Sequence, residues 1–319
     1  MSELHKFLFE GLPVRGTIVR LTDAWAEILR RRAANSATGA YPAPVRELLG
    51  EMTAAGALMQ ANIKFDGALI LQIFGDGPLK LAVVEVQPDL GLRATATVVG
   101  EVAADATLSR LVNLTNHGRC AITLDPLRKL PGQRPYQGVV PLFSDRHEKL
   151  EKLGEVLQHY MLQSEQLDTT LVLAANDAVA AGLLIQRMPV EGGNYSDEIG
   201  RNEDYNRIAT LAASLTREEL LSLDVDTILR RLFWQEKLLR FEPRVGAGGP
   251  HFACTCSRER VGNMIRGLGQ DEARSIVDER GEIEVGCEFC GRQYRFDPVD
   301  AAQLFAAPGV QAPGSSARH

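Results

Sequence analysis

The sequence predicts an α+β protein with a mixed sheet-and-helix core domain, a helical linker and a small C-terminal four-cysteine zinc domain. Strand-like and helix-like segments alternate over residues 1–190, separated by turn signals such as Gly75-Asp76-Gly77-Pro78 and Asn176-Asp177. Helical periodicity then continues, and four of the five cysteines lie between Cys254 and Cys290. With 319 residues, 45% of them apolar, the chain is long enough for about two domains.

Within the core domain, residues 1–190, the pattern predicts two strands and a helix. Residues 68–74 and 79–86 predict two strands around the Gly-Asp-Gly-Pro turn. Residues 145–163 predict a helix, because Leu150, Leu153, Leu157, Tyr160 and Met161 recur at helical spacing. Cys120 lies in the apolar run of residues 120–124, which favours a buried core thiol over a sensor.

A metastable helical linker is expected over residues 191–250. Thr216 and Glu219 form a capping-box pattern, and three apolar side chains share one helix face, Ile208, Leu211 and Leu215. The glycines of residues 244–250 predict a flexible joint before the cysteines. Beyond the last domain, residues 306–319 are rich in Pro, Gly, Ser and Ala and predict a disordered tail.

The cysteine module, residues 251–305, supplies four thiolates in two close pairs, Cys254-x-Cys256 and Cys287-x-x-Cys290. Four sulfurs in this pattern are typical of one tetrahedral Zn²⁺ ion. Ser257 is placed to cap a helix that ends at Gly269, and residues 271–279 predict a second short helix. Residues 282–285 and 294–296 predict a hairpin that presents the second pair, and Asp297-Pro298 predicts a final helix start.

Spacing alone leaves the role of the metal open. A purely structural zinc knuckle is what two cysteine pairs usually indicate. A catalytic zinc is disfavoured because four sulfurs leave no position for water. His251 is either a spare ligand or a loop residue. Because so small a module has a poor core, and zinc binding is worth roughly 10–16 kcal/mol in zinc peptides, losing the metal should unfold it.

Charge and motifs restrict the function classes. The net charge of −6 and the pI near 5.6 lack the basic footprint of general nucleic-acid binding. The first residues carry no signal-peptide pattern, and the longest apolar run, 178–185, is too short to span a membrane. Neither a nucleophile elbow, a dinucleotide fingerprint nor a zinc-protease helix is found. We expect a cytoplasmic protein that is not an enzyme and has no membrane or nucleic-acid partner.

At the cysteines the sequence closely resembles the 33 kDa chaperonin family, the redox-regulated heat-shock holdases of bacteria. Its signatures stand here as Cys254-Thr255-Cys256-Ser257-Arg258-Glu259-Arg260 and Cys287-Glu288-Phe289-Cys290. The resemblance covers nearly the whole chain, at Tyr41-Pro42, Leu48-Leu49-Gly50-Glu51, Lys64-Phe65-Asp66-Gly67, Gly75-Asp76-Gly77-Pro78, Tyr136-Gln137-Gly138 and Ser164-Glu165-Gln166. It departs at Trp234, where many members have His, at an apparent insertion over 246–250, and in the tail.

This resemblance implies a reduced, zinc-loaded and inactive monomer. It also implies that hypochlorous acid, or peroxide with unfolding stress, oxidises Cys254 with Cys256 and Cys287 with Cys290. Thiolates are both metal ligands and targets of oxidants, so oxidation should expel the zinc. The linker would then open and bind unfolding proteins without ATP, as a homodimer, protecting them from oxidative and heat-induced aggregation. The candidate client-binding residues are Leu229, Leu232, Phe233, Trp234, Leu238 and Leu239.

Two alternatives come from other functional classes. A zinc-ribbon nucleic-acid or ribosome-binding protein is suggested by the arginines near the cysteine pairs, Arg258, Arg260, Arg266, Arg292 and Arg295. A thiol oxidoreductase is suggested by Cys287-x-x-Cys290 alone, without the strand and helix of a thioredoxin-like fold around it.

Overall fold

The computed structural model describes residues 1–35, 39–128, 132–189, 200 and 202–306. Its internal contacts divide the chain into two units, Met1–Cys254 and Thr255–His319. Residues 191–199 and 201 of the predicted linker, and residues 307–319 of the predicted tail, lie outside the described residues.

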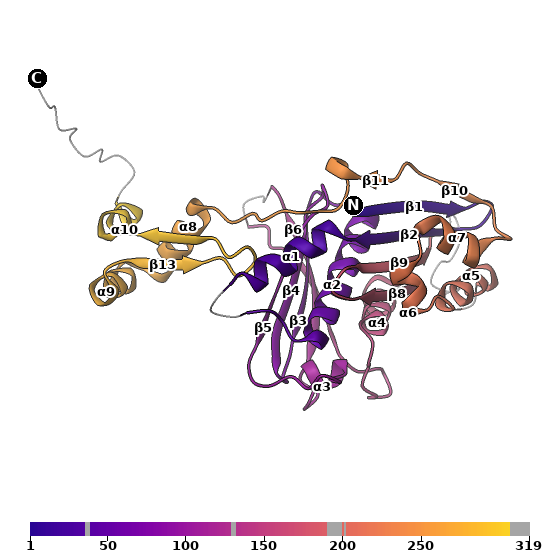
Figure 1. The fold of residues 1–319 in the computed structure, drawn as a ribbon, viewed down its shortest axis with the longest axis horizontal. Coiled ribbons are helices and arrows are strands. Elements are labelled where there is room, and N and C mark those ends of the chain that lie inside the picture. The colour runs from indigo at the N-terminus through magenta and orange to yellow at the C-terminus, as the bar shows by residue number, and fades with distance from the viewer. Residues whose placement is uncertain (36–38, 129–131, 190–199, 201, 307–319) are drawn as a thin grey trace, which may run out of the picture. The chain divides into compact units, whose positions relative to one another are not determined.

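The described part of the first unit contains two six-stranded sheets (Figure 1). The first sheet has the spatial order β10 (Leu238–Arg240), β1 (Glu3–Phe9), β2 (Val14–Leu21), β9 (Ala180–Arg187) and β8 (Thr169–Ala175), and β11 (Arg244–Val245) also pairs with β1. All eight residues of β9 are buried, because both faces of this sheet are covered. Leu184 faces one core, whereas its neighbours Leu183 and Ile185 belong to another.

The second sheet has the order β12 (His251–Phe252), β5 (Gly91–Val98), β4 (Leu79–Val86), β3 (Gly67–Phe74), β6 (Arg119–Pro126) and β7 (Tyr136–Pro141). The predicted hairpin is confirmed, since β3 and β4 pair antiparallel around the Gly-Asp-Gly-Pro turn. Cys120 pairs with Ile73 inside this sheet and is fully buried, which confirms it as a core thiol.

The long helix α2 (Ala43–Asn62) packs against strands of both sheets. It is apolar nearly all round, as expected of a helix buried on every side. Its small residues permit close approach: a Cβ added at Gly56 would lie 3.1 Å from Val86 in the second sheet, and one at Gly50 would lie 2.4 Å from Ala175 in the first. Around it lie α1 (Asp23–Ala33), α3 (Leu108–Val112) and α4 (Leu153–Glu165).

Three helices, α5 (Glu203–Ala213), α6 (Arg217–Ser222) and α7 (Val225–Phe233), share a core with the face of the first sheet turned away from α2. Each begins at a side-chain cap, namely Asn202, Thr216 and Asp224. The predicted capping box of Thr216 and Glu219 is confirmed. The predicted apolar face is buried at Ile208 and Leu215, and Leu211 packs at its edge.

The segment that follows α7 runs along the edges of both sheets, as β10, β11 and β12. Residues 244–250, predicted as a flexible joint, follow a defined path: Arg244 and Val245 pair with β1, and a 3-10 turn, η2 (Gly246–Gly248), leads to β12. The Arg244 guanidinium holds this turn through the carbonyl of Gly248, at 2.9 Å. The glycines here form a tight turn.

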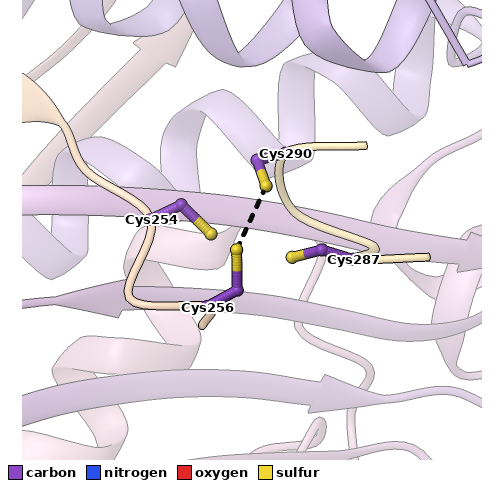
Figure 2. Close-up of side chains that lie close together, drawn as sticks. All are labelled: Cys254, Cys256, Cys287 and Cys290. Atoms are coloured by element: carbon purple, nitrogen blue, oxygen red, sulfur yellow. Dashed lines mark hydrogen bonds between the residues drawn. The ribbon is translucent and has the colours of Figure 1, made fainter. Parts of the chain in front are cut away.

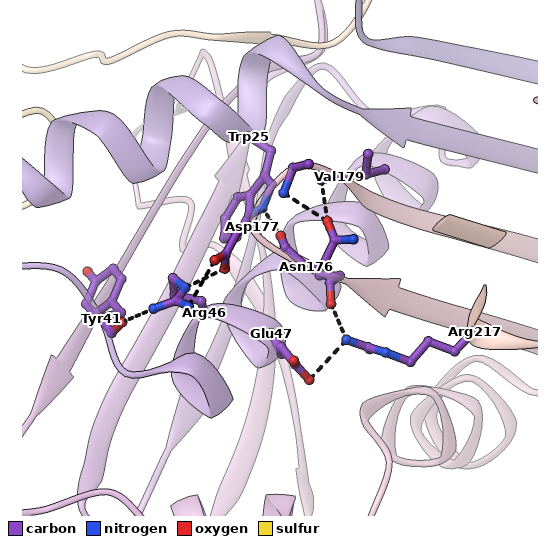
Figure 3. A network of polar contacts seen from close by, with 10 residues as sticks. Trp25, Tyr41, Arg46, Glu47, Asn176, Asp177, Val179 and Arg217 are labelled. Carbon is purple, nitrogen blue, oxygen red and sulfur yellow. Dashed lines mark hydrogen bonds and ion pairs between the residues drawn. The ribbon is translucent and has the colours of Figure 1, made fainter. Parts of the chain in front are cut away.

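The turn between β8 and β9 is fixed by side chains from three helices (Figure 3). Trp25 of α1 donates to the Asn176 carbonyl at 2.8 Å, and Arg46 of α2 pairs with Asp177 at 2.7 Å. From α6, Arg217 reaches the Ala175 carbonyl at 2.5 Å and Glu47 of α2 at 3.1 Å. These contacts tie α6 to the core of the first unit.

One predicted helix begins later than expected. The helix predicted over residues 145–163 starts at Leu153, because the preceding chain forms a tight turn in which the His147 amide donates to the Ser144 carbonyl and His147 has φ +61°. Leu150 still packs against the core, but it lies in a loop, where its amide donates to the Leu142 carbonyl.

The second unit has the elements α8 (Arg258–Leu268), α9 (Gln270–Arg280), β13 (Ile283–Gly286), β14 (Gln293–Phe296) and α10 (Pro298–Phe305). They match the helix, helix, hairpin and helix predicted there. Ser257 caps α8, and Asp297 forms a capping box with Asp300 at α10. The small core comprises Ile265, Ala273, Ile283, Tyr294, Phe296 and Ala301. Over the described residues of the whole chain, no helix is long and apolar enough to cross a membrane.

Candidate metal centre

Local turns bring each cysteine pair together. Cys254 and Cys256 lie in the irregular segment between β12 and α8, and the helix starts directly after them at the Ser257 cap. Cys287 and Cys290 lie on the turn that joins β13 to β14. There the Gly291 amide donates to the Cys287 carbonyl at 2.8 Å, and Gly291 has φ +73°, a conformation that glycine adopts without strain.

The four thiols that the spacing predicted as ligands converge on one point (Figure 2). Their sulfur atoms all lie within 4.8 Å of one another. Cys256 Sγ and Cys290 Sγ are 3.4 Å apart. All four thiols are half-buried.

This arrangement fits a tetrahedral ion with four sulfur ligands. Zn–S bonds of about 2.3 Å place the sulfurs of such a site roughly 3.8 Å apart. The observed spacings bracket that value, so small side-chain rotations suffice to close the site. The four cysteines are thus positioned to bind one metal ion.

Two further side chains contact the sulfurs. Tyr294 of β14 donates its hydroxyl to Cys256 Sγ at 3.1 Å, and this bond is the main reason why the pKa of Tyr294 lies above its ordinary value. Arg93 of β5 donates Nη1 to Cys254 Sγ at 3.6 Å. Burial lowers the pKa of Arg93, but the ion pair with Glu85 and the contact with Cys254 together raise this pKa above its ordinary value, so the guanidinium stays charged.

Other candidate residues lie elsewhere. His251 is in β12, with Nδ1 3.0 Å from the Gly249 carbonyl. Burial raises the pKa of the Cys120 thiol to about 12, which keeps it protonated and unreactive.

The candidate client-binding residues divide into two groups. Leu229, Leu232 and Phe233 are buried residues of α7, whereas Trp234 is 73% exposed. Leu238 is half-buried, and Leu239 is exposed.

Sequence reasoning missed Tyr294 and Arg93 as neighbours of the sulfurs. The hairpin prediction placed Tyr294 on the returning strand near the second pair, so its proximity could have been found from strand alternation. Arg93 lies 161 residues before Cys254. Only the pairing of β12 with β5 brings the two together, and local pattern does not reveal such pairing.

Comparison with known proteins gives a consistent result. The family model described as Hsp33 protein matches residues 2–297. The 33 kDa chaperonin of Chromobacterium violaceum is 44% identical over 318 residues, which cover 100% of this chain and 98% of the relative. That of Methylobacillus flagellatus is 41% identical, with 100% and 99% covered.

Among solved structures, the crystal structure of the 33 kDa chaperonin (heat shock protein 33 homolog) from Thermotoga maritima matches with a TM-score of 0.70. The match covers 95% of this chain and 97% of that one at 20% identity, and therefore supports the fold. The family model and the curated relatives span nearly the whole chain. The chain therefore belongs to the Hsp33 family of chaperones.

Proposed function

We propose that this chaperone is a redox-regulated, ATP-independent holdase whose switch is a zinc ion held by Cys254, Cys256, Cys287 and Cys290. The observation that carries the proposal is the convergence of four thiol sulfurs within 4.8 Å. An all-sulfur tetrahedral donor set favours zinc over harder cations. When bound, the ion holds the four sulfurs together and adds its binding free energy to the folding of the second unit.

The switching chemistry follows from the thiolates. A cysteine thiolate attacks the chlorine of hypochlorous acid, giving a sulfenyl chloride and releasing hydroxide. The neighbouring thiolate attacks that sulfur, the disulfide forms and chloride leaves. We propose the pairs Cys254 with Cys256 and Cys287 with Cys290, so two oxidant molecules convert four thiols to two disulfides. Disulfide sulfurs are poor zinc ligands, so the metal departs.

Metal loss should unfold the second unit, because its own core is small. Among the described residues of this unit, six form the buried part of that core, and two of the six are alanines. Below about 40–70 residues, an apolar core rarely stabilises a domain without a metal or disulfides. The proposed division is a core domain at 1–190, a metastable linker at 191–250 and a zinc-binding switch domain at 251–305.

The linker helices supply a binding surface when they detach. Helices α5 to α7 and the first sheet share an apolar core that includes Phe7, Phe9, Ile18, Leu183, Ile185, Ile208, Leu229 and Phe233. Opening this contact would expose both faces to unfolding proteins. Trp234 and Leu239, already exposed, would extend the same surface.

We further propose a cytoplasmic protein that is not an enzyme, a monomer when reduced and a homodimer when oxidised. A nucleic-acid partner is not proposed. The net charge is −6, and two of the candidate arginines are engaged within the second unit: Arg258 pairs with Asp300 at 2.6 Å, and Arg295 with Glu284 at 2.8 Å.

The proposal is tested by suppression of aggregation of a heat-unfolded client. Wild-type protein should be inactive when reduced and active after hypochlorous acid, with dithiothreitol reversing the change. Cys287→Ser/Cys290→Ser should remove the dependence on oxidant, while Cys120→Ser, the matched control, should keep it. Retention of oxidant dependence after all four ligand cysteines are replaced would overturn the switch.

A further inference from the structure

Strand β5 fixes the backbone that leads to Cys254. Phe252 pairs in parallel with Leu92. The amide of His251 donates to the Leu90 carbonyl at 3.2 Å, and that of Ala253 donates to the Leu92 carbonyl at 3.0 Å. The chain is therefore held by the second sheet up to the residue before this cysteine.

The next residue of β5 reaches the sulfur itself. Arg93 donates Nη1 to Cys254 Sγ at 3.6 Å and Nη2 to Glu85 Oε2 at 2.6 Å. Glu85 is the cross-strand partner of Arg93 in β4, and Gln87 donates to its other oxygen at 2.7 Å. The side chains of Arg93 and Glu85 are each only 13% exposed.

An ion pair between Arg93 and Glu85 does not require the further contact of Arg93 with Cys254 Sγ. The planar guanidinium presents several N–H donors in a fixed fork, and here one branch serves Glu85 while the other serves the sulfur. Because Glu85 anchors the fork, the branch that meets Cys254 is preorganised. A metal-bound thiolate is a charged acceptor, for which such a donor is well suited.

We propose that Arg93, oriented by Glu85, is a positioning residue for the metal ligand Cys254, so that the affinity of the metal site depends on a side chain of the core sheet. This inference rests on the proposed metal site. Loss of an outer hydrogen-bond partner typically weakens metal affinity by about 10–100-fold. Tyr294 makes the corresponding contact to Cys256 from β14.

The first test measures zinc affinity in the reduced full-length chain by competition with a chromophoric chelator. Arg93→Gln should raise the zinc dissociation constant by about tenfold or more. Arg93→Lys should fall between it and wild type, because an ammonium group cannot reproduce the fork. The matched control is Arg119→Gln, in β6 of the same sheet, whose guanidinium donates to the carbonyls of Asn116 and Gly118; its zinc affinity should equal that of wild type.

A second measurement separates positioning from general stability. With Co²⁺ in place of zinc, the thiolate-to-cobalt charge-transfer band reports the electron density on sulfur. Removing a hydrogen bond to sulfur should move the band of Arg93→Gln to longer wavelength. Because that variant leaves Glu85 without its cross-strand partner, Glu85→Gln/Arg93→Gln is measured beside it and should show the same shift with the sheet relieved of the charge.

The outcomes distinguish this inference from the function on which it rests, since neither test uses oxidant or client. If the wild-type chain binds zinc, and Arg93→Gln and the double variant keep the wild-type zinc affinity and cobalt band, the positioning role of Arg93 is overturned while the metal site stands. A reduced wild-type chain that binds neither ion overturns the metal site and this inference together.

Discussion

Replacing Phe233 by alanine should detach α7 without oxidation. Phe233 is 2% exposed and packs edge-to-face on Phe9, with ring centroids 5.0 Å apart at 90°, and at 6.1 Å from Phe7. A buried Phe→Ala change costs about 3–5 kcal/mol, including aromatic pairing. Taking about 4 kcal/mol, the equilibrium between docked and detached α7 shifts by roughly 10³-fold.

Trp234→Ala is the matched control, because Trp234 is the next residue and is 73% exposed. Its replacement should change stability by about 0.5 kcal/mol or less. Amide hydrogen exchange of the reduced proteins should show lost protection across α5 to α7 in Phe233→Ala, with α2 still protected. The reduced variant should also suppress client aggregation. Equal protection of α7 in the two variants would refute the reasoning.

Three further outcomes follow from the structure. Burial raises the pKa of Glu51 to about 7, only partly offset by Arg217. Because the pKa of Glu51 is higher in the folded than in the unfolded state, the protein loses stability as the pH rises from about 4.5 to about 7. Glu51→Gln should therefore raise the free energy of unfolding by at most about 3 kcal/mol near pH 8 and leave it unchanged near pH 4. Equal gains at both pH values would contradict this. Without denaturant, zinc-free protein should show four thiols that react with a thiol reagent and a fifth, Cys120, that reacts only on denaturation of the first unit; mass spectrometry that finds Cys120 labelled before denaturation would contradict its burial. Chelation should abolish the exchange protection of α8 to α10 and leave that of α2 intact; protected α8 without metal would mean that the small core suffices.

The elements of the second unit could be predicted closely because their signals are local. Ser257 and Asp297 cap helices through bonds to residues three positions on. Gly281 takes a left-handed φ of +83° between α9 and the hairpin. The convergence of the cysteines then follows from the folding back of the hairpin.

What the sequence did not reveal depends on long-range pairing. The ordered path of residues 244–250 along β1 and the approach of Cys254 to β5 are set by strands far away in the chain. The late start of α4 has a different cause: Leu150 keeps the helical spacing but lies in a loop, where it is partly buried against the core. Apolar residues at helical spacing indicate which side chains are buried, but they do not fix where the helix begins. Here a turn that contains a left-handed residue delays the helix start.

The measurement that tests the central claim most directly follows zinc content, free thiols and suppression of client aggregation in one sample during titration with hypochlorous acid. The account predicts that zinc release, the loss of four thiols and the gain of holdase activity occur together, and that dithiothreitol with zinc reverses all three. Activity that rises while zinc stays bound, or zinc release without any activity, would contradict it.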